Sequence, residues 1–201
     1  MKLRRALLQA SGFTLIELLI VVALVAVILG LAGPSFMSFI QMQRLRSVNA
    51  QVVTDIQFAR SEAVSRNVPV HLRFQTSAAM SCYTLYTKSV DAPSLKCDCL
   101  AAEGSRCTPP STVEVRTVQL PVSRTVRLTA TGNLADNFSF DPRTGGMVHG
   151  PIDFFTPIPD EFLVHVYIDD SRKLRNKVGL AGRISVCTPA GSTMTETACP
   201  P

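Results

Sequence analysis

The sequence has no tryptophan and few aromatic residues, and only 17% of its residues are charged whereas 46% are hydrophobic. A chain so poor in charge and so rich in apolar residues is not expected to be disordered. Helix-breaking residues are plentiful, because 13 prolines and 11 glycines occur among the 201 residues. This composition argues against a pure helical bundle and predicts one or two folded domains.

Motifs of common enzymatic and metal sites are also missing. The chain has no Walker A, G-x-S-x-G, H-E-x-x-H or G-x-G-x-x-G segment, and its six cysteines form no C-x-x-C pair. His71, His149 and His165 lie in strand-like runs or after a glycine-rich turn, which favours packing or surface roles over metal binding. We therefore predict that the protein is not an enzyme and holds no cofactor or metal.

Positive charge is concentrated at the N-terminus, since three of the five net positive charges lie within the first five residues. An apolar run from Phe13 to Gly33 follows, interrupted only by Thr14 and Glu17. As a helix rising about 1.5 Å per residue, this run would be about 31 Å long, close to the roughly 30 Å hydrocarbon core of a bilayer. It is a predicted transmembrane helix, with the basic head in the cytoplasm and the later residues beyond the membrane.

A cleaved signal peptide and a plain membrane anchor are simpler interpretations of this run. Residues 30–32 resemble a signal-peptide cleavage site, but the apolar core of such a peptide is usually about 7 to 15 residues long. Neither interpretation explains Glu17, because a carboxylate in the apolar zone costs about 2.5 to 3.5 kcal/mol. The acid therefore predicts a partner of opposite charge.

The segment GFTLIE from Gly12 to Glu17, between a basic leader and an unbroken apolar run, resembles the class III signal of type IV pilins and type II secretion pseudopilins. The resemblance implies that prepilin peptidase removes residues 1–12, and that Phe13 becomes an N-methylated N-terminus. It also implies that Glu17 directs assembly. The new ammonium group on Phe13 and the carboxylate of Glu17 on a neighbouring subunit would neutralise each other, so two charges that are costly alone become tolerable as a pair.

Residues 34–67 have the pattern of an amphipathic helix. Gly30 and Pro34 predict a kink or local melting before it, because proline removes a backbone hydrogen bond. Val68 precedes a proline, which places the helix end near Asn67. The apolar residues recur at spacings of three and four. They are Leu45, Val48, Val52, Ile56, Ala59 and Ala63.

Beyond Pro69 the apolar period changes to two, which predicts strands separated by turns. The predicted strands cover residues 68–74, 81–87, 113–120, 125–129, 137–141, 162–168 and 183–187. Residues 68–201 would form one antiparallel β-rich periplasmic head, so the fold class is α+β. The stretch from Asp91 to Pro110, rich in Pro, Ser and Cys, is the predicted long loop.

Three later segments resemble the GspH/FimT branch of minor pilins and pseudopilins: IQFARSEA at 56–63, FDPR at 140–143 and AGRISVC at 181–187. The resemblance implies a pilin fold, with an antiparallel sheet packed on the second half of a long N-terminal helix. The expected function is a minor pilin that primes type IV pilus assembly at or near the filament tip. A minor pseudopilin of a type II secretion system, with the same fold and processing, is the alternative. Expected partners are prepilin peptidase, other pilins or pseudopilins, and the inner membrane.

All six cysteines lie beyond the apolar run, in a compartment that permits oxidation. They are Cys82, Cys97, Cys99, Cys107, Cys187 and Cys199. Three disulfides are predicted, and a bond between the last two would close a short C-terminal loop, although six cysteines allow fifteen pairings. A metal site built from Cys97, Cys99 and Cys107 is the alternative.

A basic cluster near the C-terminus has two interpretations. Its members are Arg172, Lys173, Arg175, Lys177 and Arg183. They could contact DNA phosphates, which would suit a DNA receptor displayed on a pilus, or they could lie in a solvated turn after Asp169 and Asp170. FimT-like proteins linked to DNA uptake have a Gly-Arg-x-Arg motif. Gly182 and Arg183 match it, whereas Ser185 stands where the second arginine belongs.

Overall fold

The structure is a computed structural model that describes residues 13–89, 91, 94–131, 138–149 and 161–200. The chain divides into two compact units, residues 1–41 and 42–201. One helix, α1 (Leu15–Arg66), contributes residues to both units. Each unit is described separately.

The first unit consists of the apolar part of α1. Its large side chains are exposed, with Leu15 77% and Leu29 66% accessible. Helical structure continues through Gly30 and Pro34, so the predicted local melting is absent, and a kink there stays a prediction. Within the described residues, no helix meets the combined length and hydropathy requirement for crossing a membrane.

The part of α1 in the second unit is amphipathic, as the sequence predicts. The apolar residues with spacings of three and four lie on its buried face. Val48 is partly buried and packs against the other five, which are fully or almost fully buried: Leu45, Val52, Ile56, Ala59 and Ala63. The helix ends at Arg66, and Asn67 follows in the left-handed conformation with φ of 53°. Asparagine tolerates this conformation at a helix end, and the Val68-Pro69 pair then directs the chain into the first strand.

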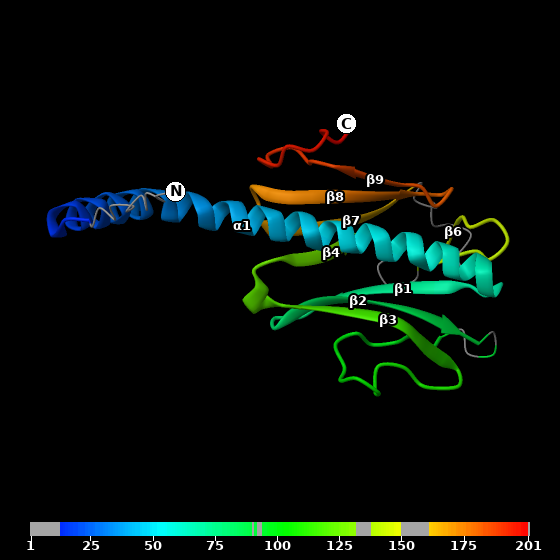
Figure 1. The fold of residues 1–201 in the computed structure, drawn as a ribbon. Helices are drawn as coiled ribbons and strands as arrows, with labels where there is room; N and C mark the ends of the chain where they lie inside the picture. Colours follow the sequence, from blue (N-terminus) through cyan, green and yellow to red (C-terminus); the bar gives the residue numbers. More distant parts are fainter. Residues whose placement is uncertain (1–12, 90, 92–93, 132–137, 150–160, 201) are drawn as a thin grey trace, which may run out of the picture. The chain divides into compact units, whose positions relative to one another are not determined.

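Among the described residues of the second unit, nine strands form two antiparallel sheets (Figure 1). The five-stranded sheet has the order β3-β2-β1-β5-β6, with β1 (Val70–Thr76), β2 (Met80–Lys88), β3 (Thr112–Pro121), β5 (Phe138–Phe140) and β6 (Met147–His149). The four-stranded sheet has the order β4-β7-β8-β9, with β4 (Arg127–Thr131), β7 (Glu161–Asp169), β8 (Arg172–Gly179) and β9 (Ile184–Cys187). A short 3-10 helix, η1 (Val122–Arg124), precedes β4.

Two of these strands, β6 and β8, were not predicted. The sequence of β8 is RKLRNKVG, and its charged residues hide a regular alternation in which Leu174, Asn176 and Val178 are buried. The solvated-turn interpretation of the basic cluster is therefore wrong, because most of the cluster lies on a paired strand. Strand β6 has three residues, which is too short for a period-two pattern to be visible.

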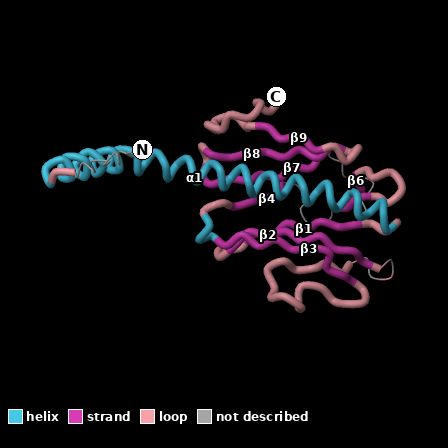
Figure 2. Tube along the Cα trace, in the orientation of Figure 1, coloured by secondary structure: helices cyan, strands magenta, loops and turns pink. Residues whose placement is uncertain are grey.

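In the second unit, α1 runs across strands of both sheets (Figure 2), and the buried core cluster contains residues from the helix and from both sheets. Phe138 on β5 stacks on Phe162 on β7 with ring centroids 4.7 Å apart, which joins the two sheets. Strand β4 is also hydrogen-bonded to the other sheet, since the N–H of Leu128 donates to Ser81 Oγ at 3.0 Å. The sheets and the helix thus share one hydrophobic core.

The five-stranded sheet is buried on both faces around β2. Tyr83 and Leu85 point into the shared core, whereas Cys82, Thr84 and Tyr86 are equally buried but lie outside the core cluster. Residues 94–111, which connect β2 to β3, contact this outer face. Because both faces of β2 are covered, all its residues from Ser81 through Tyr86 are buried, and the strand shows no alternation of buried and exposed side chains.

Candidate functional site

The start of α1 forms a capped first turn that contains Glu17. Thr14 Oγ1 accepts a hydrogen bond from the N–H of Glu17 at 3.3 Å, and Thr14 O accepts one from the N–H of Leu18 at 3.2 Å. Thr14 is therefore the N-cap, and the T-x-x-E spacing is that of a capping box. This role of Thr14 was not predicted, although the spacing is visible in the sequence.

The capped turn gives the Glu17 carboxylate a favourable local environment. A negative charge in the first turn of a helix is stabilised by the exposed N–H groups and the helix dipole, typically by about 0.3 to 1 kcal/mol. Glu17 is exposed and Phe13 is 84% accessible, so a partner could reach either residue. Gly12 and the rest of the leader lie outside the described residues.

All six cysteines are paired in disulfides: Cys82–Cys99, Cys97–Cys107 and Cys187–Cys199. The last pair closes the C-terminal loop that the sequence suggested. The alternative of a metal site at Cys97, Cys99 and Cys107 is wrong, because a sulfur held in a disulfide cannot act as a thiolate ligand. Among the described residues, no group of His, Cys, Asp or Glu side chains is arranged to hold a metal ion.

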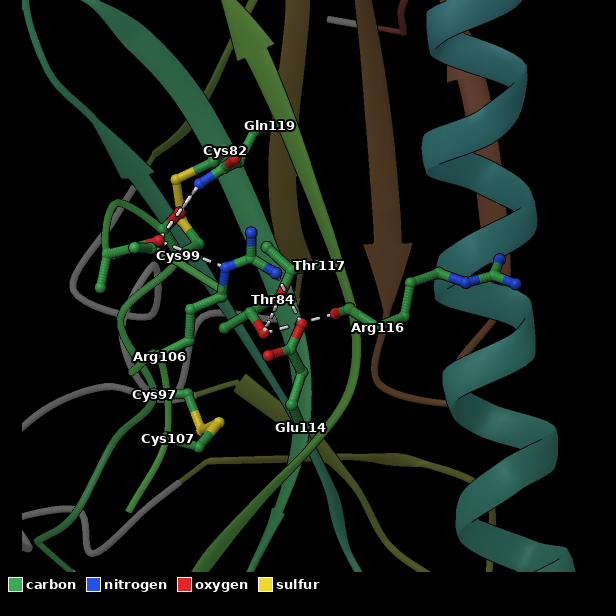
Figure 3. A network of polar contacts seen from close by, with 12 residues as sticks. Cys82, Thr84, Cys97, Cys99, Arg106, Cys107, Glu114, Arg116, Thr117 and Gln119 are labelled. Carbon is green, nitrogen blue, oxygen red and sulfur yellow. Dashed lines mark hydrogen bonds and ion pairs between the residues drawn. A yellow bond between two sulfur atoms is a disulfide. The ribbon is translucent and has the colours of Figure 1, made fainter. Parts of the chain in front are cut away.

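Cys99 is held on the outer face of the five-stranded sheet at three points. Figure 3 shows two of them, the disulfide with Cys82 and the contact with Gln119. Gln75, Cys82 and Gln119 lie in register on β1, β2 and β3. Cys82 forms the disulfide, Gln75 Oε1 accepts from the N–H of Cys99 at 2.9 Å, and Gln119 Nε2 donates to Cys99 O at 2.7 Å. The disulfide and the two backbone hydrogen bonds together hold the loop at a defined place.

A buried carboxylate, Asp55, connects α1 to the inner face of the same sheet. Tyr83 Oη donates to Asp55 Oδ2 at 2.7 Å, and Arg116 Nη1 pairs with Asp55 Oδ1. Arg116 is in register with the core residue Leu85, so its side chain lies on the sheet face toward the helix, where its guanidinium also lies over the Phe58 ring. Burial, followed by the hydrogen bond to Asp55, raises the pKa of Tyr83, so the tyrosine stays a neutral donor.

His71 occupies a buried position on β1 and stacks on Tyr86, with ring centroids 5.4 Å apart. Its Nδ1 is buried and has no hydrogen-bond partner among the described residues. Burial, with a smaller contribution from Lys88, lowers the pKa of His71 to about 4. The ring is therefore neutral at physiological pH and acts as a packing residue, in agreement with the sequence analysis.

Most of the basic cluster lies on β8, and two of its members form ion pairs. Arg172 forms an ion pair with Asp169, and Lys177 forms one with Glu161. Lys173, Arg175 and Lys177 alternate with the buried residues of β8, so they lie on the sheet face away from the core. Arg183 is exposed in the turn before β9 and does not lie on β8.

The three segments that resemble the GspH/FimT branch meet at Arg60. Gly145, after the FDPR turn, and Gly182, in the AGRISVC segment, both have positive φ and pack against the Arg60 side chain. A Cβ on Gly182 would lie 2.6 Å from Gly145 O and 3.2 Å from Arg60 Nε. These segments therefore form a close structural junction between α1 and the two sheets.

The chain matches two family models and resembles a solved structure. A comparison with curated proteins finds no match. Among solved structures, the chain is similar to the minor pseudopilin EpsH from the type 2 secretion system of Vibrio cholerae, with 12% identity and a TM-score of 0.43 over 70% of this chain and 94% of that chain. A family model of a prokaryotic N-terminal methylation motif matches residues 8–33, and the model of type II transport protein GspH matches residues 49–192. Because the GspH match covers more than half of the sequence, this chain belongs to the GspH family.

Proposed function

We propose that the chain is a minor pilin that is cut after Gly12 and incorporated at or near the tip of a type IV pilus, where it primes assembly. One observation carries the proposal: a GspH-family head and an N-terminal methylation motif occur in the same chain. A structural subunit needs no catalytic group. The disulfides, ion pairs and side-chain hydrogen bonds described above hold the fold together.

The capped turn at Glu17 supports the proposed assembly step. Cleavage after Gly12 would place a new ammonium group on Phe13, which lies next to the capping residue Thr14. The exposed carboxylate of Glu17 on one subunit could then accept the ammonium of an incoming subunit. Residues 13–33 would hold the chain in the inner membrane before incorporation, a role that rests on the sequence pattern.

The alternative is a minor pseudopilin of a type II secretion system, and the description of the matching family supports it. Both machines would use the same cleavage and the same contact between subunits. Deletion of the gene distinguishes them, because loss of surface pili with normal protein secretion favours the pilus. Loss of secretion with normal pili favours the secretion system.

The Glu17→Val variant tests the assembly role. We expect normal cleavage but at least tenfold less variant in sheared filaments, because the incoming ammonium would meet no carboxylate. Glu17→Asp is the matched control, since it keeps the charge and should incorporate better than the valine variant. Intact-mass measurement separates processing from assembly, and a Gly12→Leu chain should keep residues 1–12. Unchanged incorporation of Glu17→Val would contradict the assembly role.

DNA binding by the head is a second candidate function, favoured by the alignment of basic residues on one sheet face. Lys173 and Arg175 lie about 7 Å apart along β8, and Arg127 on β4 is in register with Tyr167 and Lys173. Lys177 continues the row along β8 but is paired with Glu161. Burial lowers the pKa of His165 on β7, and the neighbouring Arg175 and Lys173 lower it further. The face therefore has a positive potential that phosphates would find favourable.

A gel retardation experiment with the full chain in detergent tests this candidate. For three phosphate contacts, affinity should fall roughly 40-fold between 50 mM and 200 mM salt. The double variant Lys173→Ala/Arg175→Ala should bind at least tenfold more weakly, whereas Arg172→Ala is the control because Asp169 already neutralises that arginine. Absence of retardation by the unmodified chain at 50 mM salt would remove the candidate.

A further inference from the structure

We propose that residues 94–111 form an oxidation-dependent cover on the outer face of the five-stranded sheet, and that reduction releases this cover while the rest of the head stays folded. The inference goes beyond the filament role and does not depend on which machine uses the subunit. It rests on how the cover is attached, what it covers and how its base is closed.

The cover is attached mainly at Cys99. Cys82–Cys99 is the covalent bond between the cover and the sheet, whereas Cys97–Cys107 joins two residues within the cover. The backbone of Cys99 is also bound by Gln75 and Gln119, and Arg73 Nη1 donates to Cys97 O at 3.0 Å. Loss of Cys82–Cys99 therefore removes the one cross-link that connects the described residues of the cover to a strand.

The sheet face under the cover is rich in hydrogen-bonding side chains. Arg73, Gln75, Thr84, Thr117 and Gln119 all contribute polar groups there. Water could satisfy these groups after the cover leaves, so uncovering them costs little compared with exposing apolar side chains. Tyr86, which is buried on this face and stacks on His71, is the aromatic exception. The aromatic and aliphatic core cluster lies on the opposite face and keeps its contacts with α1.

The base of the cover is closed by strand pairing. Lys88 on β2 pairs with Thr112 on β3, and the N–H of Ser89 donates to Ser111 O at 2.8 Å. The β2–β3 hairpin therefore continues up to the first and last residues of the connection. Release would turn residues 94–111 into a flexible loop without separating the strands, and the entropic cost of closing a loop grows only slowly with its length.

Solvent access gives the disulfides an order of reduction. Cys107 is partly exposed, whereas Cys82, Cys97 and Cys99 have no accessible surface. A thiolate of an external dithiol would attack Cys107 Sγ, break its bond to Cys97 and release the Cys97 thiolate, which takes up a proton. The second thiol of the reagent then attacks the mixed disulfide, so the reagent is oxidised to a cyclic disulfide and Cys107 is freed as a thiol. The buried Cys82–Cys99 bond would open later by the same exchange.

Limited trypsin digestion of the full chain in detergent tests the cover, because Lys96 and Arg106 lie within it. In the oxidised chain, the Arg106 side chain is only 13% exposed and is bound to Glu114 and to Ala101 O. The Cys82→Ala/Cys99→Ala variant should be cut at Arg106 at least tenfold faster. Amide exchange in β1, β7 and β8 should stay within threefold of the unmodified chain. Cys187→Ala/Cys199→Ala is the control, and its cleavage at Arg106 should be unchanged.

Graded reduction of the unmodified chain provides a second measurement that needs no variant. With increasing dithiothreitol, followed by alkylation and mass mapping, we expect label on Cys97 and Cys107 before label on Cys82 and Cys99. Faster cleavage at Arg106 should accompany the second step. Unchanged Arg106 cleavage after Cys82–Cys99 opens would overturn the proposal, and so would loss of exchange protection throughout β1, β7 and β8 at that step.

Discussion

Asp55 shows how a single buried charge connects the helix to the sheet. Both of its carboxylate oxygens have partners, but Asp55 is 1% exposed whereas the Arg116 side chain is 47% exposed. Arg116 could regain water contacts without the acid, whereas the Tyr83 hydroxyl would stay buried. Removal of Asp55 would therefore leave the buried Tyr83 hydroxyl without its acceptor, whereas removal of the Tyr83 hydroxyl would leave Asp55 paired with Arg116.

We expect Asp55→Ala to lower the free energy of unfolding by about 3 kcal/mol, because removal of one member of a buried polar set leaves the others unpaired. Urea denaturation followed by circular dichroism measures the change. Tyr83→Phe is the matched variant and should cost about 1 kcal/mol, since it leaves Asp55 paired with Arg116. Equal losses for both variants would contradict this distribution of roles.

His71 makes the stability of the head depend on pH. Its pKa is about 4 in the folded chain against an ordinary value of 6.5, because burial disfavours the charged ring. The unfolded chain therefore binds a proton more readily, so the stabilising effect is present above pH 6.5 and is lost as the pH falls toward 4. The full effect is at most about 3 to 4 kcal/mol, because the two pKa values differ by about 2.5 units and each unit corresponds to about 1.4 kcal/mol.

Urea unfolding at pH 7.5, 5.5 and 4 tests this dependence. The His71→Phe variant keeps a ring against Tyr86 but cannot titrate, so its stability should fall less than that of the unmodified chain over this range. The difference between the two chains isolates His71 from other titrating groups. Parallel pH curves for the two chains would show that His71 does not contribute.

At the scale of elements, the junction at Arg60 explains why two glycines stand in turns of different sheets. Gly145 lies between β5 and β6, and Gly182 lies between β8 and β9. The N–H of Met147 donates to Leu180 O at 2.8 Å, which connects the two turns directly. A side chain on either glycine would separate the turns from α1, because backbone and guanidinium atoms occupy the space.

We expect Gly182→Ala to cost about 3 kcal/mol, from the positive φ of 72° and from the contact of the new Cβ with Gly145 O. Gly191→Ala is the control, because Gly191 has a φ of 81° but no atom within 4 Å of the added Cβ. It should cost only about 1 kcal/mol, the price of the backbone conformation. Urea midpoints compare the variants, and similar losses would show that the close contact relaxes.

At the scale of the whole molecule, the residues that form the core and the residue proposed to direct assembly lie in different units. The buried core contains residues from Leu45 onward, within the second unit, whereas Glu17 and the exposed apolar side chains around it belong to the first. The Glu17→Val variant should therefore keep the urea midpoint of the unmodified chain while its incorporation into filaments falls. A lower midpoint would show that the two functions are not separable.

The local sequence determined those features that depend on neighbouring residues. The three- and four-residue spacing of apolar side chains predicted the buried face of α1, and the Val68-Pro69 pair predicted where the helix ends. The GFTLIE segment indicated the family. An acid in an apolar run is costly, so its presence there is a specific signal of this type of N-terminus. Local sequence also predicted seven of the nine strands in the described residues, because their side chains alternate or turn residues stand at their ends.

Only the tertiary structure decided which distant residues meet. The basic residues of β8 hid its alternation, and nothing near Cys99 in the sequence indicates that Cys82, Gln75 and Gln119 hold it. The partners of Asp55 and the junction at Arg60 likewise come from strands far along the chain. Disulfide pairing, buried ion pairs and close glycine contacts depend on distances in space, and these distances exist only after the sheets have packed on the helix.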